Sequence, residues 1–220
     1  MTSEFDIESR SAAKRRAILA AAEKVFLKSG YDGTSMDEIA ALAGVSKQTV
    51  YKHFADKERL FSEIILGTTN KIDAVVKQVA DKLTDTQDLE RDLGLLGREF
   101  ITTLMNPNLL RLRRLVIATA ERMPKVSTAW YEQGFERVLA TLASCFQRLT
   151  EQRLLMVDDP LLAANHFAGL LLWIPVNQAM FTGGTQIASK VELDRYADAG
   201  VRTFLAAYGV KLKPGARRPK

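Results

Sequence analysis

Cysteine and histidine are scarce in this chain of 220 residues. Cys145 is the single cysteine, and His53 and His166 are the two histidines. One cysteine cannot form an internal disulfide, which fits a reducing compartment, and these three residues cannot build a usual Cys/His metal cluster. The motifs H-E-x-x-H and G-x-S-x-G and a glycine-rich phosphate loop are also missing. We therefore predict no catalytic site, no metal and no cofactor.

Long apolar runs are absent as well. The longest, Phe167–Val176, is too short to span a bilayer and contains Pro175. Met1–Ser11 is polar and acidic with no apolar run after it, unlike a signal peptide. Because 47% of the residues are hydrophobic, the chain can bury a substantial core as one or two domains. We expect a cytoplasmic protein that makes no contact with a membrane.

The formal net charge of +5 is concentrated near the C-terminus. Met1–Leu60 holds ten Lys and Arg against nine Asp and Glu, whereas Lys211–Lys220 holds five basic residues and no acid. Bulk attraction to nucleic acid is therefore not indicated for the N-terminal part. We expect a disordered basic tail over residues 210–220, either solvated or weakly attracted to DNA. The run Lys14-Arg15-Arg16 fits equally a phosphate-facing or a solvated helix start.

The chain shows no strand-like alternation, and we predict an all-α fold of about nine helices. Prolines 107, 124 and 160 and the pair Gly183-Gly184 mark breaks between helices. The expected helices cover Ala13–Ser29, Met36–Ala43, Lys47–Phe54, Asp56–Leu83, Asp88–Met105, Leu109–Arg122, Val126–Gln152, Asp159–Phe181 and Ser189–Tyr208.

The segment from Gly30 to Leu60 carries the most information. Ser35 with Glu38 has the form of a capping box, Gly44 is a helix stop, and Ser46 can cap a second helix. Two short helices joined by so tight a turn cross steeply, as in a helix-turn-helix. The second helix would bury Val50 and Phe54. Gln48 and Thr49 suit base edges, and Lys47, Tyr51 and Lys52 suit bases or phosphates. An ordinary helix pair of an all-α core has the same spacing.

Four runs in this region carry a family resemblance: A-A-x-x-V-F (Ala21–Phe26), G-Y-D-G-T-S (Gly30–Ser35), I-A-A-L-A-G-V-S (Ile39–Ser46) and T-V-Y-K-H-F-A-D-K-E-R-L (Thr49–Leu60). They resemble the DNA-binding domain of the tetracycline-repressor (TetR) family of transcriptional regulators. The resemblance implies double-stranded DNA as a partner. It implies phosphate contacts for Thr34, Ser35 and Lys57, and major-groove contacts for Gln48, Thr49, Tyr51, Lys52 and His53.

The C-terminal part resembles, more loosely, the AefR-like subgroup of the same family, through Arg113–Gly134 and Leu171–Phe181. This implies a homodimer formed by helices near 160–181 and 190–208, and a small-molecule effector. The helix over residues 160–181 is apolar all round, so it must be buried within one chain or between two. Candidate effector-binding residues combine apolar bodies with a few polar tips, as ligand pockets do, but cores have the same mixture. They are Phe100, Leu104, Met123, Trp130, Tyr131, Phe135, His166, Trp173, Asn177 and Gln178.

Together these features predict a flexible arm over 1–12, a three-helix helix-turn-helix DNA-binding domain over 13–59, and a helical ligand-binding and dimerisation domain over 60–209. The expected function is that of a homodimeric repressor that binds a palindromic operator and is released by a small, largely apolar ligand. Two alternatives stay open. One is a DNA-binding regulator without an effector, and the other is a helical interaction protein that no longer binds DNA. The sequence selects no ligand, operator or regulated gene.

Overall fold

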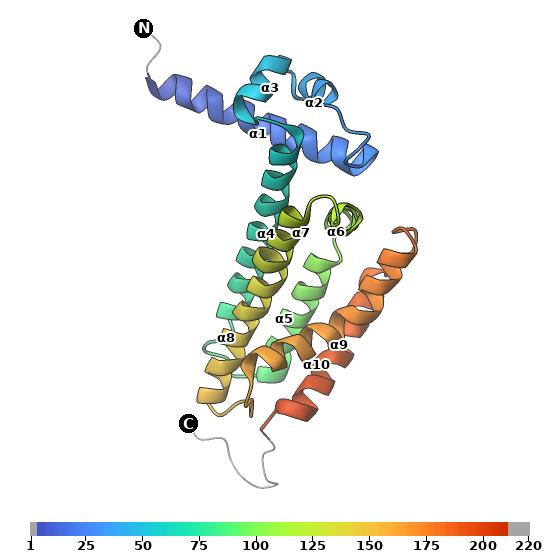
Figure 1. The fold of residues 1–220 in the computed structure, drawn as a ribbon. Coiled ribbons are helices and arrows are strands. Elements are labelled where there is room, and N and C mark those ends of the chain that lie inside the picture. Colours follow the sequence, from blue (N-terminus) through green and yellow to red (C-terminus); the bar gives the residue numbers. More distant parts are fainter. Residues whose placement is uncertain (1–3, 211–220) are drawn as a thin grey trace. The chain divides into compact units, whose positions relative to one another are not determined.

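A computed structural model describes residues 4–210 of the chain, with side chains from residue 10 onward. These residues form ten α-helices and one π-helical segment, and no strand occurs among them (Figure 1). The all-α prediction is therefore confirmed. The elements are α1 (Glu4–Ser29), α2 (Met36–Ala43), α3 (Lys47–His53), α4 (Lys57–Asp81), α5 (Leu89–Leu104), α6 (Pro107–Thr119), α7 (Pro124–Trp130), η1 (Tyr131–Glu136), α8 (Arg137–Glu151), α9 (Pro160–Phe181) and α10 (Lys190–Tyr208).

Three regions differ from the sequence-based expectation. The helix expected over Leu109–Arg122 spans Pro107–Thr119. The helix expected over Val126–Gln152 is divided by the π-helical segment η1, which contains Gly134 and has no buried residue. Hence neither packing nor helix propensity favours a regular α-helix there. The first helix begins at Glu4, so much of the arm expected over residues 1–12 is helical. The expected tail beyond residue 210 lies outside the described residues. None of the described helices is long and apolar enough to cross a membrane.

The chain divides into two compact units. One contains the described residues up to Thr69 together with Arg111–Tyr131, and the other contains Asn70–Leu110 with the described residues from Glu132 onward. The first unit therefore holds more than the helix-turn-helix region expected over residues 13–59, because α7 and most of α6 belong to it. Helices α4 and α6 contribute residues to both units.

The core of the first unit is built on three fully buried phenylalanines, Phe26 of α1, Phe54 after α3 and Phe61 of α4. The ring centroids of Phe26 and Phe61 lie 5.1 Å apart, in a tilted arrangement that aromatic pairs favour. Leu112 and Val116 of α6 join the same cluster. The three helices of the helix-turn-helix region are thus held on a core that α4 and α6 complete.

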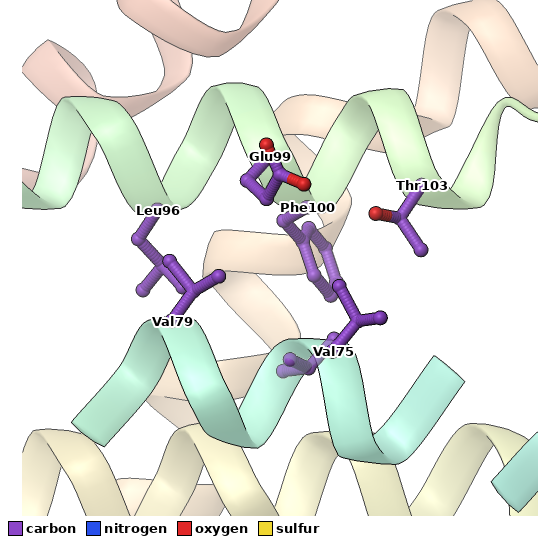
Figure 2. Close-up of a pocket in the computed structure, with 7 residues that line it drawn as sticks. Val75, Val79, Leu96, Glu99, Phe100 and Thr103 are labelled. Atoms are coloured by element: carbon purple, nitrogen blue, oxygen red, sulfur yellow. The ribbon is translucent and has the colours of Figure 1, made fainter. Parts of the chain in front are cut away.

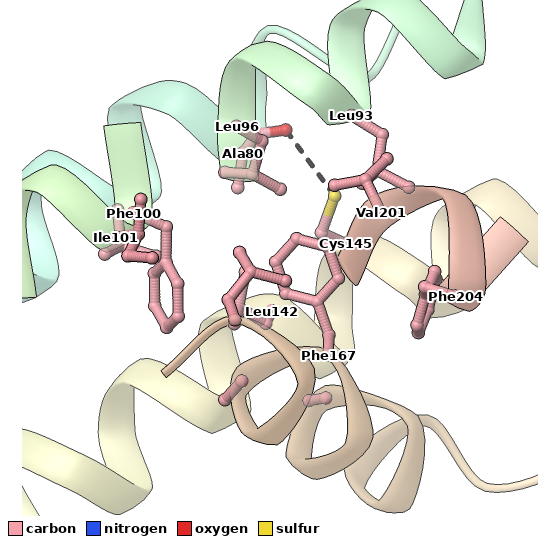
Figure 3. Close-up of a cluster of buried hydrophobic side chains, with 14 of the residues drawn as sticks. Ala80, Leu93, Leu96, Phe100, Ile101, Leu142, Cys145, Phe167, Val201 and Phe204 are labelled. Carbon is pink, nitrogen blue, oxygen red and sulfur yellow. Dashed lines mark hydrogen bonds between the residues drawn. The ribbon is translucent and has the colours of Figure 1, made fainter. Parts of the chain in front are cut away.

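The core of the second unit lies among α4, α5, α8, α9 and α10 (Figure 3). Phe204 is its centre, with ring centroids 4.8 Å from Phe146 and 5.3 Å from Phe167. Helix α10 packs closely on α9 at Gly200, where an added Cβ would lie 2.5 Å from Leu171 Cδ1. Burial raises the pKa of the Cys145 thiol to about 11, so it is protonated at neutral pH and suited to packing.

Candidate functional site

The turn between α2 and α3 is fixed by side-chain and backbone caps. The Ser35 hydroxyl accepts the backbone N–H of Glu38 at 3.1 Å, and Gly44 ends α2 in the left-handed region at φ 66°. The carboxylate of Glu38 lies 3.8 Å from Lys28 Nζ and forms an ion pair with it. The expected capping box is therefore present only in its first half, the Ser35 cap. The Ser46 hydroxyl caps α3 by accepting the backbone N–H of Thr49 at 3.1 Å. These local contacts set the path of the chain into α3.

Helix α3 buries Val50 and presents its polar residues away from the core. The exposed side chains are Lys47, Gln48, Tyr51 and Lys52, and the half-buried ones are Thr49 and His53. The Thr49 hydroxyl lies 2.8 Å from that of Ser46. The structure thus brings six of the nine expected DNA-binding residues together on this short helix.

Lys47 of α3 forms an ion pair with Asp37 of α2. Its ammonium lies 2.8 Å from one carboxylate oxygen of Asp37 and donates a hydrogen bond to the other at 3.0 Å. This hydrogen bond and the charge of Asp37 raise the pKa of Lys47. The side chain therefore stays cationic and lies at the junction of α2 and α3.

The other expected DNA-binding residues have structural contacts. Thr34 is only 4% exposed, and its hydroxyl donates to the carbonyl of Gly30 at 2.6 Å. Its hydroxyl is therefore already hydrogen-bonded within the loop, and the phosphate contact of Thr34 stays a prediction. The Lys57 ammonium donates to the carbonyls of Tyr31 and Thr34 at 2.9 and 3.0 Å. Lys57 thus connects the α1–α2 loop to α4 through these hydrogen bonds. Ser35 is exposed at the start of α2.

A second contact reinforces the loop. Arg122 donates to the Asp32 carboxylate at 2.7 Å, and its guanidinium lies 5.0 Å from the Tyr31 ring centroid. Lys57 Nζ lies 4.6 Å from the same centroid. Burial raises the pKa of Tyr31, and the nearby Glu58 adds to this effect. Arg122 thus forms an exposed ion pair that holds the α1–α2 loop.

The candidate effector-binding residues are divided between the two units. Met123 is buried in the core of the first unit, and Trp130 packs against that core. Phe100 is buried in the core of the second unit, and Leu104 packs against it. Aromatic and methionine side chains on buried faces are thus largely core residues here, which was the alternative interpretation of the sequence.

The remaining candidates are solvent-accessible. Tyr131 and Phe135 lie on η1 and are exposed. His166 is exposed on α9, with Nδ1 2.6 Å from the Tyr208 hydroxyl. Its imidazole is therefore not part of the hydrophobic core.

Trp173 was one of the candidate effector-binding residues, and its side chain is exposed in the structure. Its side chain is 73% exposed, whereas Leu171 is fully buried. Two residues along a helix correspond to a rotation of about 200°, so the two side chains point in nearly opposite directions. The Asn177 amide donates to the Trp173 carbonyl at 2.6 Å, and Gln178 is exposed.

A narrow crevice lies between α4 and α5 in the second unit (Figure 2). Its empty volume is about 160 Å³, too constricted for a water molecule. Apolar side chains form most of its wall, and Glu99 and Thr103 supply polar groups. Of its lining residues, Phe100 alone was a candidate from the sequence. The other lining residues come together through the packing of α4 on α5, which the sequence pattern does not show. The lining residues are Val75, Val76, Val79, Leu96, Glu99, Phe100 and Thr103.

The outward face of α9 carries large apolar side chains at helical spacing. Leu162, Leu170 and Trp173 are all exposed, with His166 between them on the same stripe. Soluble monomers rarely expose a contiguous apolar patch of this kind. The α9 stripe, defined by these four residues, is therefore a candidate interface.

Comparison with known proteins places both parts of the chain in one family. A model of the N-terminal domain of bacterial regulatory proteins of the tetR family matches residues 18–64. A model of the C-terminal domain of AefR-like transcriptional repressors matches residues 91–210, more than half of the chain. This chain belongs to the TetR family of transcriptional regulators.

Solved structures of TetR-family proteins extend the match over the whole fold. One from Mesorhizobium loti, described as a TetR-family transcriptional regulator, is 55% identical, with a TM-score of 0.88 over 91% of this chain and 99% of the other. The flavonoid-responsive regulator FrrA is 27% identical, with a TM-score of 0.68 over 92% and 98%. The resemblance found in the sequence is therefore confirmed.

Curated TetR-type relatives match over shorter spans. The transcriptional activator FasR of Mycolicibacterium smegmatis is 36% identical over 74 residues, or 34% of each chain. The repressor TetR of Mycobacteroides abscessus is 36% identical over 110 residues, or 47% of this chain and 52% of the relative. The chain thus matches about a third to a half of these relatives' length.

The contacts of Lys57 generate a prediction about stability. We expect Lys57→Met to lower the free energy of unfolding by about 1–3 kcal/mol, because two backbone carbonyls lose a charged donor. Lys52→Met, at an exposed position, is the control and should change stability by less than about 0.5 kcal/mol. Urea unfolding followed by circular dichroism measures both. Equal stability of the two variants would rule out a clamping role for Lys57.

Proposed function

We propose that this TetR-family regulator is a homodimeric repressor that binds a palindromic operator and is released by a small, largely apolar ligand. The observation that carries the proposal is the polar face of α3, formed by exposed side chains on a helix with a fixed start. Gln48 and Tyr51 can reach base edges from this face, because the N-terminal part of a recognition helix lies deepest in the major groove. Lys52 adds a cation for a phosphate.

The same unit offers contacts that set the orientation on DNA. The exposed Ser35 hydroxyl lies at the start of α2, where backbone N–H groups attract a phosphate. Lys47 lies beside it, paired with the exposed Asp37. Solvent screens this surface ion pair, so a phosphate can compete for the ammonium. We assign Lys57 and Thr34 a supporting role, since their polar atoms already hold the α1–α2 loop.

The α9 stripe supports the homodimer. Leu162, Leu170 and Trp173 would be removed from water by the same stripe of a second copy, as in a two-fold interface. Helix α10 adds exposed small residues at Ala199, Thr203 and Ala206, which recur at helical spacing and allow close approach. Two copies related in this way would present two α3 helices to a palindrome with spaced half-sites.

The α4–α5 crevice supports an effector site in the second unit. A ligand that opened it would displace residues of α4, and α4 also contributes Lys57–Thr69 to the first unit. Moving a two-state equilibrium from 99:1 to 1:99 requires about 5.5 kcal/mol of differential affinity. The similar regulator FrrA is flavonoid-responsive, so flat aromatic molecules are the first ligands to try. The constricted crevice equally favours the alternative, a DNA-binding regulator without an effector.

Operator binding tests the proposed role of α3. We expect the double variant Gln48→Ala/Tyr51→Ala to bind operator DNA at least about 30-fold more weakly, since base contacts each contribute about 1–3 kcal/mol. Fluorescence anisotropy with DNA from upstream of the protein's own gene, across a salt series, measures this. Gln147→Ala, an exposed position on α8, is the control. Weak binding to every sequence, unaffected by the double variant, would contradict recognition through α3.

The oligomeric state tests the α9 stripe. Trp173→Glu should weaken dimer formation by about 30-fold or more, because a charge replaces a buried aromatic anchor. Sedimentation velocity across a dilution series gives the dissociation constant of the dimer. Leu42→Glu introduces the same charge at an exposed apolar position of α2 and should leave the dimer intact. A Trp173→Glu protein that dimerises normally would exclude this stripe as the interface.

Release by ligand is tested on the preformed protein–operator complex. We expect a panel of flavonoids to include one that releases the wild-type protein, and Val79→Trp to require at least about tenfold more of it, because the indole fills the crevice. Lys77→Trp adds the same ring at an exposed position of α4 and should respond as wild type. Flavonoids that bind the protein without changing operator affinity would favour the regulator without an effector.

A further inference from the structure

Arg15, in the basic run near the start of α1, is bound to another helix of the first unit. Its guanidinium donates a hydrogen bond to the carboxylate of Glu63 on α4 and forms an ion pair with it. Arg15 lies three residues before Ile18, which is fully buried in the core of this unit. Residues at this spacing share one face of a helix, so Arg15 lies beside the side of α1 that packs on the core. Neither a phosphate nor solvent is needed to account for its charge.

Arg15 also contacts the residue that ends α3. The central carbon of its guanidinium lies 5.2 Å from the ring centroid of Phe54, a distance at which a cation is attracted to the face of an aromatic ring. The backbone N–H of Phe54 donates to the carbonyl of Val50 at 2.9 Å, and the Phe54 side chain is fully buried. One side chain therefore joins α1, the end of α3 and α4.

Helix α3 depends on contacts at its two ends. It is seven residues long, and Val50 is the buried residue within it. A helix of two turns is not stable by itself in water, so its direction is set by what holds it. The Ser46 cap holds its start, and Phe54, covered by Arg15, holds its end. Loss of the second contact would leave the direction of α3 less well fixed.

We propose that Arg15 is a positioning residue for DNA recognition. Together with Glu63 it fixes the Phe54 side chain, and hence the direction of α3, without contacting DNA itself. This inference rests on the proposed role of α3 in base contacts. A carboxylate competes with a phosphate for a guanidinium group, so a phosphate-binding Arg15 would be opposed by Glu63. The two roles of Arg15 therefore predict opposite effects of removing the charge of Glu63.

Fluorescence anisotropy with operator DNA measures the sign of this effect. We expect Arg15→Gln and Glu63→Gln each to weaken operator binding at least about fivefold, because each disrupts the contacts that hold Phe54. The double variant should bind no more weakly than Arg15→Gln alone, since the two residues act through one contact. Lys24→Gln removes the same charge at an exposed position of α1, and should change binding by less than about twofold because solvent and salt screen it. Glu63→Gln that binds operator as tightly as wild type, or more tightly, overturns the proposal.

Hydrogen exchange of the unbound protein, followed by NMR, tests the position of α3 without DNA. The N–H of Phe54 should exchange at least about fivefold faster in Arg15→Gln and Glu63→Gln than in wild type, because its hydrogen bond opens locally more often. The N–H of Gly44, which donates to the carbonyl of Ala41 at the end of α2, should exchange as in wild type. This second amide separates a local effect on α3 from a loss of stability of the whole unit. Unchanged exchange at Phe54 overturns the proposal even where operator binding falls.

The Gln48→Ala/Tyr51→Ala variant distinguishes failure of this inference from failure of the proposed function. If this variant weakens operator binding and Glu63→Gln does not, the role of Arg15 is overturned and recognition through α3 stands. If neither variant weakens binding, recognition through α3 fails, and the role of Arg15 fails with it. Circular dichroism of each variant establishes that it is folded.

Discussion

Helix α4 is long enough to contribute to both hydrophobic cores of this protein, and the rest of the structure depends on this. Leu60, Phe61 and Ile65 of α4 are buried in the core of the first unit, and Val76 and Ala80 of the same helix are buried in the core of the second. Exposing either set to water costs about 1.5–3 kcal/mol for each large side chain. A displacement of α4 in one core would therefore act on residues of the same helix in the other core.

The helix-turn-helix region could be predicted because its determinants are local. Ser35, Gly44 and Ser46 act on backbone groups within a few residues of themselves, so their roles follow from spacing alone. Helices α9 and α10 were predicted closely for the same reason, since Asp159 and Ser189 cap their first turns. Where a local signal was weak, as around Gly134, the predicted helix was wrong in detail.

The roles of individual side chains were harder to predict, because they depend on which face of a helix meets another. Trp173 and Leu171 are alike in the sequence, yet one is exposed and the other is buried. Met123 and Trp130 pack in the core of the first unit, because α7 and most of α6 pack with that unit. Thr34 and Lys57 were assigned by resemblance to DNA contacts, and their hydrogen bonds to the loop became evident only from the fold.

Helix α9 connects the sequence to the proposed assembly. Its composition left open whether it is buried within one chain or between two. In the structure, one side of α9 is buried within the chain and includes Ala164, Phe167 and Leu171. The other side, with Leu162 and Trp173, is exposed. A single chain leaves this second apolar side in water, whereas the proposed pair of chains would bury it on both copies across a two-fold axis. The same axis would place two copies of α3 for a palindrome, so one exposed stripe supports both the dimer and the symmetry of the DNA that it would bind.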